Sequence, residues 1–141
     1  MHQLPSHRSH CKNTVTRLFI IGLGGFLGAI SRYLMAGWAQ NLSRSTSFPY
    51  GTLAVNILGS FLLGFLVRYA FVHNVFSPEA RALIFIGFLG AFTTFSTFSN
   101  ESFNLMADGA MLAGLLNIAS NVLIGLGAVW LGQSLALILG R

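Results

Sequence analysis

Four long apolar segments dominate this chain and restrict what it can fold into. They cover about residues 18–39, 51–72, 80–106 and 110–139. A helix needs about 20 apolar residues to cross the hydrocarbon core of a bilayer, so each segment is long enough. Lipid offers no hydrogen-bond partners, and a spanning segment of this kind must therefore be helical. The sequence predicts an all-α integral membrane protein with four transmembrane helices.

Composition agrees with a surface that faces lipid. Only 8% of the 141 residues are charged, whereas soluble domains carry about 25% charged residues. A chain with so few charges cannot cover a water-facing surface. The net charge of +5 comes from basic residues scattered singly along the chain, as is typical of membrane-flanking positions and not of nucleic-acid binding. We expect membrane lipid as a partner and no nucleic acid.

The amino-terminal end differs from the rest of the chain. Residues 1–16 are polar and basic without apolar periodicity, and we expect them to be a disordered tail. A four-helix transmembrane domain of residues 17–141 follows. A cleaved signal peptide is the alternative for the first apolar segment, but Arg32 and Tyr33 interrupt the place where the cleavage site would lie.

The basic residues are distributed unequally between the two sides of the predicted bundle. An even number of spans places both termini on one side. Six basic residues fall on that side and two, Arg32 and Arg44, fall on the other. The positive-inside rule therefore favours a cytoplasmic amino terminus. The six are Arg8, Lys12, Arg17, Arg68, Arg81 and Arg141.

The third apolar segment changes character near its middle. Its first half is apolar, while residues 93–102 are rich in hydroxyl side chains. Gly87 and Gly90, followed by the β-branched Thr93 and Thr94, make a weak point where a helix could unwind. Broken helices occur at membrane depth only where protein or a water-filled cavity surrounds them. We predict that the third helix is broken near its middle, where freed carbonyls could hold a small cation.

Two phenylalanines follow the predicted break at helical spacing. Phe95 and Phe98 lie on one face, and Thr94, Thr97 and Glu101 form an adjacent strip. Aromatic rings have an electropositive edge, so ring edges beside hydroxyl donors can attract an anion without a full positive charge. A pore needs such a site because a fully charged one would hold the ion too tightly. A stripe of rings used only for packing is the alternative.

Amides occur in two otherwise apolar segments. Asn56 lies near the middle of the second segment, and Asn117, Ser120 and Asn121 share one face of the fourth. Polar side chains inside a membrane are costly and often functional, but they also join helices by hydrogen bonds. The pattern therefore indicates either a wet path or a strongly bonded interface. Gly24 and Gly28 similarly indicate close helix packing, within one chain or between chains.

Four short helices enclose little space, so a conduit between polar faces needs at least a dimer. Two-fold dimers are the commonest assembly. The sequence shows no nucleophile–base pair and no Cys/His set with metal-ligand spacing, and we expect no enzyme activity.

Three motifs resemble the CrcB family, the Fluc fluoride channels. They are residues 24–33 (GGFLGAISRY), 51–61 (GTLAVNILGSF) and 87–99 (GFLGAFTTFSTFS). The resemblance implies a fluoride-selective channel in the cell inner membrane or plasma membrane. It also implies a dual-topology homodimer, whose subunits insert in opposite orientations and form two pores. Such channels export cytoplasmic fluoride passively and give fluoride resistance.

The resemblance also implies a role for individual residues of the pore. By the family's pattern Asn56 lines the pore, and Phe95 and Phe98 form the aromatic boxes that contact fluoride. Ser96 and Thr97 belong to a polar track along the third helix.

The resemblance also implies roles for residues other than Phe95 and Phe98. The fourth helix adds polar groups to the track, for which Asn117 and Asn121 are the candidates. The family holds a structural Na⁺ through backbone carbonyls at the helix break, here those of Gly90 and Thr93. The resemblance also implies that Arg32 lies in an aqueous vestibule, where it would attract anions.

The chain departs from the family's pattern in two respects. Ala91 stands where many relatives have a second glycine, and the charge bias of six to two exceeds what dual topology favours. Some relatives are paired genes, so a heterodimer is an alternative to the homodimer. A small multidrug exporter is also a dual-topology four-helix dimer, but it needs a membrane-embedded carboxylate that the first helix lacks. A non-transporting scaffold subunit leaves the hydroxyl-rich half-helix unexplained.

Overall fold

The computed structural model describes the backbone of residues 7–140 and side chains from Thr14 onward. All nine elements of this part are helical, and two of them, η1 and η2, have the wider π-helical turn. The elements are α1 (His7–Ser43), α2 (Tyr50–His73), α3 (Pro78–Arg81), η1 (Ala82–Leu89), α4 (Gly90–Phe92), α5 (Phe95–Ala107), α6 (Met111–Ala119), η2 (Ser120–Ile124) and α7 (Gly125–Leu139).

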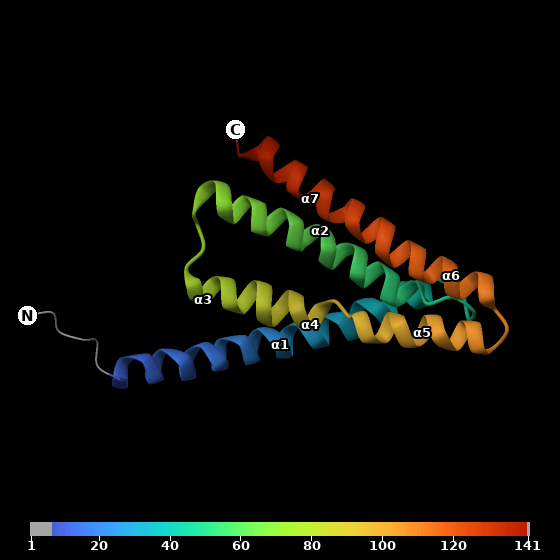
Figure 1. Ribbon diagram of the computed structural model, residues 1–141, viewed down its shortest axis with the longest axis horizontal. Coiled ribbons are helices and arrows are strands. Elements are labelled where there is room, and N and C mark those ends of the chain that lie inside the picture. The colour runs from blue at the N-terminus through green and yellow to red at the C-terminus, as the bar shows by residue number, and fades with distance from the viewer. Residues whose placement is uncertain (1–6, 141) are drawn as a thin grey trace, which may run out of the picture.

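The elements combine into four helices long and apolar enough to cross a membrane. These helices are Thr14–Ser43, Tyr50–His73, Pro78–Ala107 and Met111–Leu139. The predicted all-α architecture with four transmembrane helices is confirmed. In Figure 1, α2 and α7 run side by side, while α1 lies along the third helix, against η1 and α4. The α5–α6 pair closes the bundle at the end opposite to both chain termini.

The predicted break in the third helix is confirmed and lies at two threonines. Thr93 (φ −83°, ψ 157°) and Thr94 (φ −148°, ψ 115°) have extended backbone, and α5 begins at Phe95. Gly87 and Gly90 remain helical on the amino-terminal side. The hydroxyl of Thr94 accepts from the Thr97 N–H, which is the usual way in which threonine caps a helix start. The third helix is therefore two helices in sequence.

The start of α1 differs from the disordered tail predicted for residues 1–16. Residues 7–16 are helical, and residues 1–6 lie outside the described residues, where the expected disorder stays a prediction. The sequence between His7 and Leu18 contains no glycine or proline. Extension of an existing helix costs little compared with its nucleation, so the membrane-spanning part of α1 supports further turns before it.

Two glycines of the first motif, Gly24 and Gly28, serve packing within the chain. A Cβ added to Gly24 would lie 3.0 Å from the Phe88 amide nitrogen and would overlap the Leu83 carbonyl oxygen. A Cβ on Gly28 would overlap the Phe88 carbonyl oxygen. The backbones of α1 and η1 thus approach as closely as glycine allows. This contact holds the amino-terminal half of the third helix against α1.

Replacing Gly24 with Ala is expected to destabilise the bundle by about 1–3 kcal/mol, because the added methyl group overlaps the backbone of η1. The measurement is thermal unfolding of the detergent-solubilised protein. Gly25→Ala is the matched control, since a Cβ there meets nothing within 4 Å and alanine favours a helix over glycine. Equal unfolding midpoints for the two variants would contradict a tight α1–η1 contact.

Candidate functional site

One side-chain amide holds the break in the third helix. The Thr94 N–H donates to Asn56 Oδ1 at 2.9 Å, and Asn56 Nδ2 donates to the Thr94 carbonyl at 3.2 Å. The extended backbone of Thr94 cannot use helical partners, and the interior of a membrane supplies no water in their place. Asn56 of α2 therefore satisfies both polar groups of the residue at which the helix is interrupted.

The Asn56 amide is the first member of a hydrogen-bonded chain. Asn56 Nδ2 also donates to Asn121 Oδ1 at 2.8 Å, and Asn121 Nδ2 donates to the carbonyl oxygen and Oδ1 of Asn117, both at 3.0 Å. Asn117 Nδ2 donates to Ser102 Oγ at 2.9 Å, and Ser102 Oγ donates to the Phe98 carbonyl at 2.7 Å. We call Asn56, Asn121, Asn117 and Ser102 the amide chain.

The ring pair occupies the first turn of α5, directly after the break. The rings of Phe95 and Phe98 meet edge to face, with centroids 4.9 Å apart and planes at 84°. Phe98 is 8% exposed, whereas Phe95 is 78% exposed. One ring is thus packed inside the subunit, and the other projects from it. Lipid or another protein chain must cover the outer ring.

A cavity of about 320 Å³ lies beside the break, and we call it the inner cavity. It brings together residues of α2, the third helix and η2 that are far apart in sequence. Its lining includes most of the residues predicted for the ion site. These are Asn56, Gly90, Thr93, Phe95, Phe98 and Asn121, together with Thr94.

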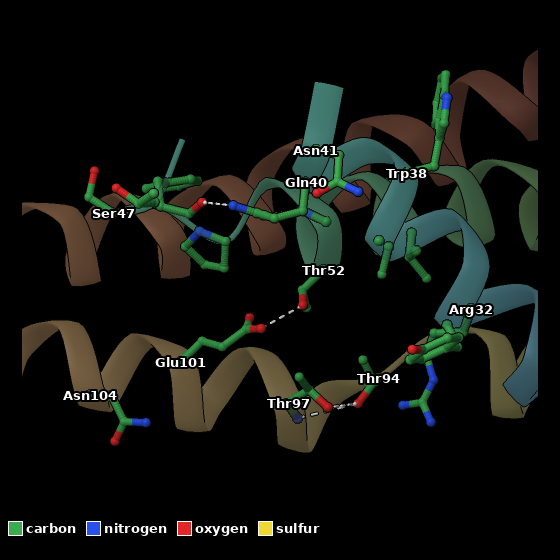
Figure 2. Close-up of a pocket in the computed structure, with 18 of the residues that line it drawn as sticks. Arg32, Trp38, Gln40, Asn41, Ser47, Thr52, Thr94, Thr97, Glu101 and Asn104 are labelled. Carbon is green, nitrogen blue, oxygen red and sulfur yellow. Dashed lines mark hydrogen bonds between the residues drawn. The ribbon is translucent and has the colours of Figure 1, made fainter. Parts of the chain in front are cut away.

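A larger cavity of about 960 Å³, the outer cavity, opens on the other side of the break. Arg32 lies on its α1 side, and Thr94, Thr97 and Glu101 of the third helix lie along its floor (Figure 2). Thr94 Oγ1 donates to Thr97 Oγ1 at 2.8 Å, so the Thr97 hydroxyl hydrogen is left for another acceptor. Thr94 lines both cavities, which makes the break the boundary between them.

Two residues of the outer cavity were not found by sequence reasoning. Thr52 Oγ1 donates to Glu101 Oε1 at 2.7 Å across the cavity (Figure 2). Gln40 holds the α1–α2 connection, since its Nε2 donates to the Ser45 carbonyl at 2.7 Å and its Oε1 accepts from the Gly51 N–H at 2.9 Å. Thr52 precedes Asn56 by one helical turn, and this spacing could have indicated it.

The predicted site residues thus divide into three groups. Asn56, Phe95, Phe98 and Asn121 meet at the inner cavity, and Arg32 and Thr97 at the outer one. Ser96 is exposed and Asn117 is fully buried, and neither lines the inner or the outer cavity.

The backbone carbonyls at the break do not have the hydrogen-bond partners that they would have in a continuous helix. In an α-helix the Thr94 N–H would donate to the Gly90 carbonyl, four residues earlier. Here it donates to Asn56 instead, which releases the Gly90 carbonyl from that bond. The Thr93 carbonyl belongs to an extended residue. Among described residues no group of three or more His, Cys, Asp or Glu gathers for a metal.

Comparison with known proteins identifies the family. Residues 19–133 match the family described as CrcB-like protein, Camphor Resistance (CrcB). Fluoride-specific ion channel FluC 1 of Methanosarcina acetivorans is 48% identical over 85% of this chain and 90% of that protein. Fluoride-specific ion channel FluC of Hahella chejuensis is 49% identical over 86% and 95%, respectively.

The chain therefore belongs to the CrcB (FluC) family, which is a family of ion channels and not of enzymes. The resemblance predicted from the three motifs is confirmed. Four membrane-length apolar helices and this membership make the chain a multi-pass protein of the cell membrane.

Replacing Asn56 with Leu is expected to destabilise the protein, because the Thr94 N–H and carbonyl lose their partner. Each buried group left unpaired costs about 1–3 kcal/mol. Thermal unfolding in detergent measures the loss. Asn100→Leu makes the same change at an exposed position of α5 and controls for the loss of an amide. An Asn56→Leu protein as stable as this control would show that the break does not depend on Asn56.

Proposed function

We propose that this chain is the subunit of a fluoride-selective channel that lets cytoplasmic fluoride leave the cell passively. The observation that carries the proposal is the ring pair, Phe95 and Phe98, placed at a helix break between two cavities. Relatives that share almost half of the residues are named fluoride-specific ion channels. Passive export of this kind gives fluoride resistance.

Fluoride is small and strongly hydrated, so a pore must replace its water with hydrogen-bond donors and electropositive groups. The edges of Phe95 and Phe98 supply positive potential without a full charge. The uncommitted hydroxyl hydrogen of Thr97 supplies a donor on the side of the outer cavity. The exposed hydroxyl of Ser96 extends the same polar track outward. Asn56 and Asn121 line the inner cavity, where their engaged amides hold the break beside the ring pair.

The outer cavity serves as the vestibule. Its Arg32 carries a permanent positive charge and attracts anions from solution. From there an ion reaches Thr97 and Thr94 at the break. Anions thus concentrate at the entrance, while the weakly polar ring pair beyond it lets them leave again.

The functional unit in this proposal is an antiparallel homodimer. Phe95 is 78% exposed and Ser96 is exposed as well, so one subunit supplies only one side of the conduit. A second copy in the opposite orientation covers these side chains. The two copies together complete the walls of two equivalent pores. Six basic residues lie on one side of the bundle and two on the other, which argues for a single fixed orientation of this chain in the membrane. The alternative assembly is therefore a heterodimer with a relative that inserts in the opposite orientation.

A structural Na⁺ is proposed at the break, held by the backbone carbonyls of Gly90 and Thr93. Support comes from the Gly90 carbonyl, which the Thr94 N–H leaves free by bonding to Asn56. Na⁺ prefers oxygen ligands, and unwound backbone supplies them in other membrane proteins. Such an ion would neutralise the carbonyl ends of α4 where two subunits meet.

The alternative function is a dual-topology exporter of the small multidrug type. That chemistry exchanges protons at a carboxylate inside the membrane, and α1 contains no acidic residue. Glu101 of α5 is bonded to Thr52 beside the outer cavity instead. The names of the relatives favour the channel.

Purified protein in liposomes is expected to release trapped fluoride passively and to retain chloride. The measurement is ion-selective electrode recording after a K⁺ ionophore is added to liposomes loaded with KF or KCl. Protein-free liposomes are the control for leak. Fluoride that stays trapped while the ionophore works would contradict the channel. Uptake of cationic drugs driven by a pH gradient would support the exporter.

Replacing Phe95 or Phe98 with Ile is expected to lower fluoride release by at least about tenfold, because bulk is kept while the electropositive ring edge is lost. Phe103→Ile is the matched control, since Phe103 is 66% exposed on α5 and lines neither cavity. The measurement is initial fluoride efflux per reconstituted protein, with size-exclusion profiles to check assembly. Normal efflux in both ring variants would remove the rings from the mechanism.

A further inference from the structure

The orientation of every amide in the amide chain follows from one backbone group. The Thr94 N–H can only donate, so Asn56 must turn its Oδ1 toward it and its Nδ2 toward the Thr94 carbonyl. Asn56 Nδ2 then needs an acceptor, which is Asn121 Oδ1. Asn121 must in turn donate, and it does so to the carbonyl oxygen and Oδ1 of Asn117. The break thus sets the direction of the whole chain of hydrogen bonds.

The amide chain also returns to the helix in which it starts. Beyond Asn117 it continues through Ser102 Oγ to the carbonyl of Phe98. Its two ends, Thr94 and Phe98, enclose the turn of α5 that carries both rings of the ring pair. The intervening members are Asn56 of α2, Asn121 of η2, Asn117 of α6 and Ser102 of α5 itself. Hydrogen bonds that run through three other elements therefore connect the two ends of this turn.

Asn117 and Ser102 lie too deep to meet an ion along this route. Asn117 is 0% exposed and Ser102 is 1% exposed, and neither lines the inner or the outer cavity. Rotation of the Asn117 amide would turn its nitrogen toward the Asn121 nitrogen, so that two donors would face each other. Such a mismatch is costly in a buried, water-free site. The observed orientation is therefore fixed.

We infer that Asn117 and Ser102 are positioning residues, which hold the ring pair and Asn56 in place through the amide chain without touching the transported ion. The inference rests on the proposed function and deepens it. The inference assigns different roles to the two asparagines of the fourth span, because Asn121 lines the inner cavity and Asn117 does not. Loss of either Asn117 or Ser102 interrupts the same connection between the break and the Phe98 carbonyl.

The test uses Asn117→Leu, Ser102→Ala and the double variant in the full-length protein. Each single change is expected to reduce fluoride efflux by about tenfold, which is the ratio that corresponds to the free energy of one hydrogen bond. The double variant is expected to lose no more than either single one, because both changes break one connection. Ser134→Ala is the matched control, since Ser134 Oγ makes the same type of bond, to the Trp130 carbonyl at 2.8 Å, on an exposed face of α7.

Hydrogen–deuterium exchange at the break supplies a readout that local packing around Ser102 would not change. Asn117→Leu and Ser102→Ala are expected to speed exchange at residues 93–95, which hydrogen bonds connect to Asn117 through Asn121 and Asn56. Multiplicative losses of efflux, or unchanged exchange at residues 93–95, would overturn the inference. If Asn117→Leu does not fold, Ser102→Ala alone decides both readouts. A wild-type protein without fluoride efflux refutes the proposed function, while the exchange result still tests the amide chain.

Discussion

The fold depends on one pair of hydrogen bonds, those between the Asn56 amide and the backbone of Thr94. An interrupted helix inside a membrane exposes N–H and carbonyl groups that lipid cannot satisfy. A side-chain amide has one donor and one acceptor side, so it replaces both missing partners at once. Without these two hydrogen bonds the third span would form a continuous helix or leave the polar groups of Thr94 unpaired. The α2 helix therefore decides the shape of the third helix.

The break gives the third span two halves with separate functions. The amino-terminal half is apolar and packs closely on α1 through Gly24 and Gly28. The carboxyl-terminal half, α5, begins inside the span with its hydroxyls and ring pair in the first turn. A helix start also carries partial positive charge, which suits an anion near Phe95. Close packing on one side of the break thus supports a polar turn on the other, the turn at which the proposed channel would meet its ion.

Sequence reasoning was sufficient for properties that depend on local composition. Apolar length predicted the four helices, and the glycine and threonine pattern predicted a break near the middle of the third, which the structure has at Thr93 and Thr94. The helical start of α1 was missed because polar composition does not show that a helix can extend from an adjoining span. The Thr52–Glu101 bond was missed because it joins residues 49 positions apart. Such a contact depends on how helices pack, which spacing within one helix does not show.

The same limit explains why the amides were left with two interpretations. Asn117 and Asn121 are one turn apart on one face, yet Asn117 is fully buried while Asn121 also borders the inner cavity. What separates a structural polar group from one available to an ion is whether its donors are already engaged. Both amide hydrogens of Asn56 are engaged, whereas the hydroxyl hydrogen of Thr97 is left for another acceptor. In the proposed channel, Thr97 and the ring edges are therefore the groups best suited to meet the ion, and the amides hold these groups in place.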